Sequence, residues 1–285
     1  MMQNLICRGI GPRSVAVMAL MLTSAIAGPA WAETLGGGFD VRPSAAGGKI
    51  VTGGVSDATG DTVAGQRVFG FDFGSDDPSQ PFFTQDPGFN ALVGSGLQAG
   101  ALSFDVLGPS TGSALPYNLS YWDGTGNVSW SAAPSGEQLQ WNRGASNLFV
   151  GSTTNALVSG YTIGTVAGAG NIHIHLNAFL NGSDGNSIPA GPGDWGAGDG
   201  VQAAEGVYAL SIVLKNGTLG NSNPIWIVYT TSGMPDGVGD TAMAWLNAHA
   251  VPEPSSSLLC GVGGAFLACA GRRARLRSQA GAQGV

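Results

Sequence analysis

Short stretches in which apolar and polar residues alternate recur along most of this 285-residue chain, and turn-forming residues separate them. Alternation with a period of two places one set of side chains in the core and the other in solvent, as in a β-strand. The alternation is clearest at 102–106, whereas 207–214 is apolar on both faces and is predicted to be a central strand. The predicted strands are 49–55, 66–73, 101–107, 119–122, 127–131, 137–142, 148–151, 160–166, 171–179, 207–214 and 225–231.

Helical patterns are scarce between the strands. One short helix is predicted at 242–248, with Asp240 as its N-cap. Two long segments, 74–100 and 181–200, are rich in Gly, Asp and Pro and are predicted to be loops. The pattern predicts an all-β fold, an antiparallel β-sandwich or jelly-roll-like single domain over residues 33–250.

The N-terminal segment has a different composition. Arg8 and Arg13 precede an apolar run, and the small residues Ala30 and Ala32 flank Trp31 after it. A positive region, an apolar region and a small-x-small site form the layout of a secretory signal peptide. Residues 1–32 are therefore predicted to be a signal peptide that is cleaved after Ala32.

The C-terminal segment combines a stiff turn, an apolar run and a basic cluster. The apolar run 258–270 is short for a permanent membrane span, which needs about 20 apolar residues. Its small residues suit close packing against another membrane helix, and arginines after it favour the cytoplasmic side. The turn is Val251, Pro252, Glu253 and Pro254, and the basic cluster is Arg272, Arg273, Arg275 and Arg277.

This order of parts resembles the PEP-CTERM sorting domain of bacterial exported proteins, over residues 251–278, with 279–285 as a tail. The resemblance implies recognition of the Pro-Glu-Pro stretch by an exosortase, a membrane-embedded enzyme that processes the chain there. The expected partners are then the Sec translocon, signal peptidase, the exosortase and, before processing, the inner membrane. The protein is expected to be exported, transiently anchored in the inner membrane, and then at the cell surface or extracellular.

The two ends hold most of the positive charge and every cysteine. The full chain has a formal net charge of −7, from 11 basic and 18 acidic residues. Without the six arginines of the ends and Glu253, five basic and 17 acidic residues remain, a net charge of 5 − 17 = −12. So acidic a domain repels nucleic acid. Because Cys7, Cys260 and Cys269 all lie in the ends, thiol catalysis and cysteine-based metal sites are excluded for the mature domain.

His173 and His175 are the sharpest chemical feature inside the domain. Residues two apart in a strand share a face, so both imidazoles point the same way, with backbones about 7 Å apart. This spacing suits two ligands of one Zn, Cu or Ni ion. The alternative is two polar residues on the wet face of a half-buried strand. The residues considered for a third ligand are Asp184, Asp194, Asp199 and His249.

The body of the chain is also similar, in short blocks, to one PEP-CTERM family, some of whose members belong to zinc-regulated operons. The blocks are Lys49-Ile-Val-Thr-Gly53, Asp86-Pro-Gly-Phe-Asn90, His173-Ile-His-Leu176 and Pro224-Ile-Trp-Ile-Val-Tyr229. This similarity implies no known activity, and it makes zinc the metal of interest.

Two further patterns have ordinary interpretations as turns. Gly108-Pro-Ser-Thr-Gly112 matches the G-x-S-x-G nucleophile pattern, but Pro116 and a predicted strand follow it where a hydrolase needs a helix. The segments 181–186 and 194–199 are rich in Asp, Asn and Gly, but they lack the alternation and the closing glutamate of an EF-hand calcium loop.

Tryptophans offer another possible binding surface. A row of aromatic faces on a sheet stacks sugar rings, although tryptophans in strands more often lie in the core. Trp195, in a glycine-rich segment, is the one expected to be exposed. The six in the predicted domain are Trp122, Trp130, Trp141, Trp195, Trp226 and Trp245.

Together these observations predict a non-enzymatic exported protein of the envelope or extracellular matrix, processed by an exosortase. One alternative is a zinc-binding exoprotein that uses His173 and His175. Another is a carbohydrate-binding surface module with an exopolysaccharide as its partner.

Overall fold

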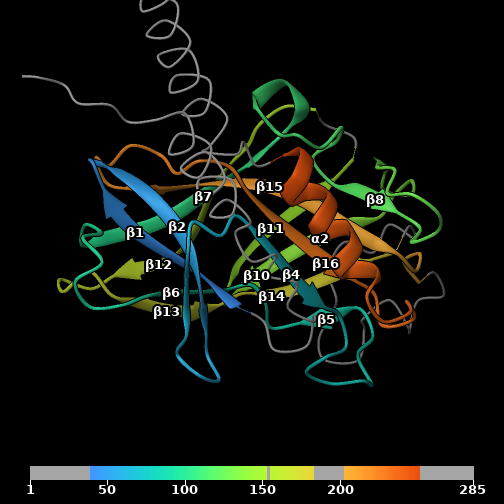
Figure 1. Ribbon diagram of the computed structural model, residues 1–285, viewed down its shortest axis with the longest axis horizontal. Coiled ribbons are helices and arrows are strands. Elements are labelled where there is room, and N and C mark those ends of the chain that lie inside the picture. The colour runs from blue at the N-terminus through green and yellow to red at the C-terminus, as the bar shows by residue number, and fades with distance from the viewer. Residues whose placement is uncertain (1–38, 153–154, 183–201, 251–285) are drawn as a thin grey trace, which may run out of the picture. The chain divides into compact units, whose positions relative to one another are not determined.

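The structure, a computed structural model, describes residues 39–152, 155–182 and 202–250, and strands are the main secondary structure in these ranges (Figure 1). The first strands are β1 (Phe39–Ala46), β2 (Lys49–Ser56), β3 (Thr62–Ala64), β4 (Val68–Asp72), β5 (Phe83–Thr84), β6 (Gly88–Ala91), β7 (Gly100–Leu107) and β8 (Ser120–Trp122). They are followed by β9 (Ser131–Ala132), β10 (Gln138–Arg143), β11 (Ser146–Gly151), β12 (Val158–Val166), β13 (Ile172–His175), β14 (Asn177–Asn181), β15 (Val207–Asn216) and β16 (Ile225–Thr230). The helices in these ranges are a 3₁₀ turn, Pro109–Thr111, and α2 (Val238–His249). The all-β prediction is therefore confirmed.

The strands form three sheets. One has the order β13-β6-β1-β2-β3, and a second has the order β11-β10-β14-β5. The third runs β12-β7-β15-β16-β4, and β8 extends it by pairing with β15 and with β9. Pairing is antiparallel except between β1 and β6 and between β16 and β4, which are parallel.

A tight hairpin joins β1 to β2. Its two-residue loop is Gly47-Gly48, and both residues have positive φ, 58° and 77°, which glycine adopts without steric strain. Phe39 pairs with Ser56 at the far end of the hairpin. The hairpin thus brings the start of β1 beside the residues that follow β2. β1 was missing from the predicted strands.

Two of the sequence-based predictions for neighbouring segments are wrong. The segment 74–100, predicted to be a loop, contains β5 and β6. The pattern does not reveal them, because both strands are too short for alternation to be visible. The predicted strand 171–179 is two strands that belong to different sheets. The break falls at Leu176, which is fully buried and whose N–H donates to the Pro87 carbonyl.

The main hydrophobic core takes residues from all three sheets. Val41 and Phe89 come from the first sheet, Trp141 from the second, and Phe104 and Tyr229 from the third, and all five are essentially inaccessible to solvent. β15 pairs with β7, β8 and β16 and is buried along almost its whole length, which confirms the predicted central strand.

α2 covers part of the other face of the third sheet, where it contacts β4 and β16 (Figure 1). Ala242 and Leu246 of the helix pack there in a second apolar cluster with Trp226 and Val228. The helix begins earlier than predicted, with Gly237 at the N-cap position and Asp240 in its first turn. Within the described ranges no helix has the length and apolarity to cross a membrane.

The predicted strand 127–131 is also wrong. β8 pairs with the two-residue β9, and the intervening residues form a loop in which Asp123 accepts hydrogen bonds from Thr125. Exposed polar residues such as Asn127 and Ser129 leave this loop without the apolar contacts that would hold a strand.

Candidate metal centre

Two imidazoles lie together on the outer surface of the first sheet. His173 and His175 occupy β13, an edge strand, and their Nε2 atoms are 3.1 Å apart. The side chains are 53% and 37% exposed, whereas Ile172 before them and Leu176 after them are buried. The two histidines therefore share the solvent-facing side of the strand, as residues two apart must.

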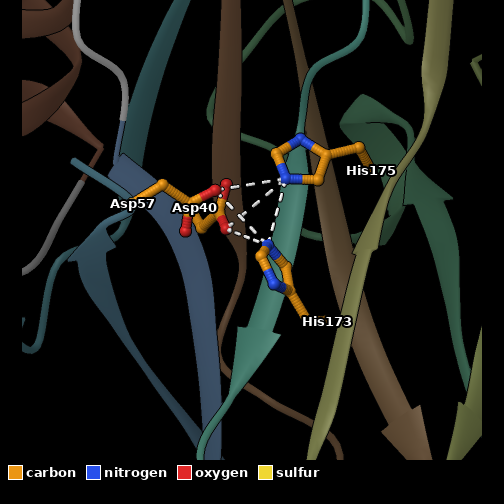
Figure 2. Close-up of side chains that lie close together, drawn as sticks. All are labelled: Asp40, Asp57, His173 and His175. Atoms are coloured by element: carbon orange, nitrogen blue, oxygen red, sulfur yellow. Dashed lines mark hydrogen bonds and ion pairs between the residues drawn. The ribbon is translucent and has the colours of Figure 1, made fainter. Parts of the chain in front are cut away.

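Two carboxylates from distant parts of the sequence meet these imidazoles (Figure 2). Asp40 comes from β1, and Asp57 directly follows β2, so the Gly47-Gly48 hairpin places both at one end. The Oδ2 atom of Asp57 is 3.3 Å from each histidine Nε2. The Oδ2 atom of Asp40 is 3.4 Å from Nε2 of His173 and 3.9 Å from that of His175.

These four residues are a group that could hold a metal ion, because one ligand atom from each lies within 4.8 Å of all the others. Asp40 comes from β1, both histidines come from β13, and Asp57 lies in the turn after β2, so the fold itself assembles the donor set. We call these four residues the metal centre. Figure 2 shows β6 passing between the histidine strand and the Asp40 strand.

Gly88 of β6 makes this meeting possible. It pairs with His175 across the β6–β13 ladder and lies directly below the point where Asp40 and His175 approach. A β-carbon at this position would collide with the Asp40 carboxylate and lie 2.8 Å from Cε1 of His175. The missing side chain therefore creates the space in which the carboxylate and the imidazole meet.

Asp40 is the most buried residue of the metal centre. Its side chain is 4% exposed, and its Oδ2 atom is buried with no hydrogen-bond partner. Burial of the carboxylate, opposed by the neighbouring His175, raises the pKa of Asp40 to about 7. A buried carboxylate oxygen without a donor is costly, so a cation placed among these side chains would satisfy it.

Asp57 behaves in the opposite way. Burial acts to raise its pKa, but the neighbouring Asp40, the hydrogen bond from Asn90 and the charges of both histidines lower it overall. The pKa of Asp40 is therefore shifted upward and that of Asp57 downward, although the two carboxylates are neighbours. A metal ion at the centre would compete with protons for both carboxylates, as metal binding to carboxylates generally does.

His175 has a third carboxylate behind it. Its Nδ1 atom is 3.5 Å from Oδ1 of Asp86 and 3.2 Å from the carbonyl oxygen of Gln85. The hydrogen bond to Asp86, opposed by partial burial and supported by the charges of Asp40 and Asp57, raises the pKa of His175 to about 9. Three carboxylates therefore surround two imidazoles, and the centre attracts cations.

The structure departs from the predicted ligand set in its carboxylates. His249, one residue considered for the third ligand, ends α2, where Nδ1 lies 2.8 Å from the carbonyl of Trp245 and the ring stacks on that tryptophan. It is not part of the metal centre. Asp184, Asp194 and Asp199 lie outside the described residues, as do most of the 181–186 and all of the 194–199 calcium candidates.

Other predicted features have plain structural roles. Ser110 lies in the 3₁₀ turn and donates its hydroxyl to the carbonyl of Asn155, and Gly112 after it has a φ of 97°. A turn, not a strand-to-helix elbow, therefore explains the G-x-S-x-G pattern.

The tryptophans that the structure describes lie mainly in the core. Trp122, Trp141 and Trp226 are buried, and Trp130 and Trp245 are partly buried and pack edge-to-face on each other. Trp195 lies outside the described residues.

The predicted targeting residues also lie outside the described ranges. This applies to the signal peptide with Ala30 and Ala32, to the apolar run 258–270, and to the motif and basic cluster at Val251, Pro252, Glu253, Pro254, Arg272, Arg273, Arg275 and Arg277.

Comparison of the chain with family models, with curated proteins and with solved structures finds no match. The geometry of the metal centre and the sequence at the two ends are therefore the features that indicate a function.

Proposed function

We propose that the protein is an exported metal-binding protein whose β-domain holds one divalent transition-metal ion, zinc in the first instance. The ligand atoms are Nε2 of His173 and His175 and Oδ2 of Asp40 and Asp57. The distance between the two nitrogens, 3.1 Å, and the four distances between a nitrogen and an oxygen, 3.3, 3.3, 3.4 and 3.9 Å, carry the proposal. A tetrahedral ion with bonds of 2.0–2.1 Å requires ligand separations of about 3.3–3.4 Å.

The donor set selects the class of metal. Imidazole nitrogen together with carboxylate oxygen suits zinc, copper and nickel, whereas calcium and magnesium prefer oxygen alone. All cysteines of the chain lie in its predicted targeting ends, so thiolate is not available to the domain. The similarity of short sequence blocks to a family with members in zinc-regulated operons favours zinc within this class.

Binding is proposed in preference to catalysis. Catalytic zinc sites commonly have three protein ligands and keep a fourth position for water, whereas sites with four protein ligands hold the ion without an open position. Four side chains are already close enough here to fill a tetrahedral shell. The protein is thus proposed to be non-enzymatic.

Export is proposed from the sequence of the ends. A signal peptide at 1–32 would direct the chain to the Sec translocon and signal peptidase, and the Pro252-Glu253-Pro254 stretch to an exosortase. The domain between them is proposed to be a β-sandwich of the jelly-roll type. An acidic, cysteine-free domain with a surface metal site suits capture of a metal ion outside the cytoplasm.

The test is metal analysis of the purified exported domain. After dialysis against zinc and then buffer, the wild-type protein should retain about one zinc ion per chain. A double variant, His173→Ala with His175→Ala, should retain almost none. His249→Ala is the matched control, because its histidine belongs to α2 and should leave zinc binding unchanged. A wild-type protein that retains no more zinc than the double variant would exclude the proposed function.

A further inference from the structure

The segment from Asp86 to Asn90 lies between the two sides of the metal centre. β6 pairs with β13 so that His175 faces Gly88 and His173 faces Asn90. On its other edge β6 pairs with β1 in parallel. Phe89 is fully buried in the core, so its neighbours in β6, Gly88 and Asn90, are on the side of the metal centre. Asp86, which precedes the strand, lies on the same side because it contacts His175.

Asp86 contacts the rear of one ligand. Its Oδ1 atom is 3.5 Å from Nδ1 of His175, and the Gln85 carbonyl lies 3.2 Å from the same nitrogen. Two acceptors at Nδ1 hold the proton of the neutral imidazole on that nitrogen. Nε2, the atom that faces the other three ligands, then keeps its lone pair for a metal ion.

Asn90 contacts the rear of another ligand. Its Nδ2 atom donates a hydrogen bond of 3.0 Å to Oδ1 of Asp57. This contact occupies one carboxylate oxygen and leaves Oδ2, which is 3.3 Å from both histidine Nε2 atoms, directed at the centre. Asp86 and Asn90 therefore act on one nitrogen ligand and one oxygen ligand from the same short segment.

Resting on the proposed metal-binding function, we propose that Asp86 and Asn90 are positioning residues that tune the metal centre through His175 and Asp57. Neither residue needs to touch the ion. Partners of this kind orient metal ligands, and their loss typically weakens metal affinity 10- to 100-fold. Within the block 86–90, Asp86 would thus orient His175, and Asn90 would orient Asp57.

The experiment measures zinc affinity by competition with a chromophoric chelator, on the full exported domain. Affinity should fall in the order wild type, Asp86→Asn, Asp86→Ala, with the last weaker than wild type by about 10-fold or more. Asn90→Ala should weaken zinc binding by a similar factor. The matched controls are Asp61→Asn and Asn127→Ala, which change exposed residues outside the metal centre and should bind zinc as wild type does.

Cobalt provides a readout that a purely structural role does not affect. Co²⁺ substituted into wild type should give the visible absorption of a tetrahedral ion, and Asp86→Ala and Asn90→Ala should shift or weaken that absorption. If both variants match wild type in zinc affinity and in the cobalt spectrum, the positioning role is wrong while metal binding stands. If wild type itself binds no zinc, the proposed function has failed instead.

Discussion

The hydroxyl of Tyr229 donates a hydrogen bond of 2.9 Å to the main-chain carbonyl of Asp86. Tyr229 is fully buried on β16, and its hydroxyl also accepts a hydrogen bond of 2.7 Å from Nε1 of Trp141 on β10. A chain of two hydrogen bonds, one buried and one partly buried, thus joins two sheets to the residue that contacts His175. The surface metal centre is therefore fixed to the core at Asp86.

Replacing Tyr229 with Phe tests this connection. The change leaves the indole N–H of Trp141 and the carbonyl of Asp86 without their partner, and each unpaired buried group costs about 1–3 kcal/mol. We expect the free energy of unfolding in urea to fall by about 2 kcal/mol or more. Tyr117→Phe is the control, because no hydrogen bond of its hydroxyl is found among the described residues, and it should change stability little. Equal stability of the two variants would contradict the connection.

Gly88→Ala tests whether the metal centre needs the space above β6. The added β-carbon would displace the Asp40 carboxylate and press on Cε1 of His175, so two ligands move together. We expect zinc affinity to fall at least about 10-fold. Gly168→Ala is the control: its β-carbon would meet no atom within 4 Å, so it should bind zinc normally. Unchanged zinc binding by Gly88→Ala would mean that the ligands do not meet where the structure places them.

The sequence revealed half of the metal centre. His173 and His175 were visible because their spacing of two is a property of one strand, and a strand keeps such residues on one face. Asp40 and Asp57 were not predicted, because only the hairpin and the order β13-β6-β1 bring them to the histidines. Sheet order depends on contacts between distant segments, which a local pattern does not encode.

The strands, like the metal ligands, include some that the sequence pattern predicts and some that it does not. β7, β15 and β16 were predicted because they are long and have clear apolar patterns. β1 contains Arg42 and Pro43 and ends in small residues, and β6 is four residues long, so neither has a visible period. The sequence contained one signal for the missed ligand Asp40, which lies between the apolar residues Phe39 and Val41. A charged residue between two apolar neighbours can be buried with them, and a buried carboxylate is a candidate functional group.

The predicted sorting motif can be tested in the natural host. With Pro252, Glu253 and Pro254 all changed to Ala, an exosortase has no recognition stretch, so the chain should stay in the membrane fraction at its unprocessed mass. Replacing the three serines at 255–257 with Ala is the neighbouring control and should leave processing unchanged. Localisation and mass identical to wild type in the triple variant would show that no exosortase acts at this motif.

Asp72 predicts a pH dependence of stability that is independent of the metal centre. Burial raises the pKa of Asp72 above its ordinary value of 3.8, and the charges of the nearby Asp240 and Asp236 add to the effect. The folded protein therefore binds this proton more tightly than the unfolded chain does. The resulting stability is complete below pH 3.8 and is lost as the pH rises through the folded-state pKa.

Asp72→Asn removes the charge and keeps the size and shape of the side chain. We expect the variant to melt at a higher temperature than wild type at pH 7, and the difference to shrink as the pH falls toward 3.8. Asp61→Asn, at an exposed position in the turn before β3, should show no such convergence. Thermal unfolding of the metal-free proteins across this pH range measures the effect. A variant that is less stable than wild type at pH 7 would mean that the Asp72 carboxylate makes a favourable interaction that outweighs its burial and its two acidic neighbours.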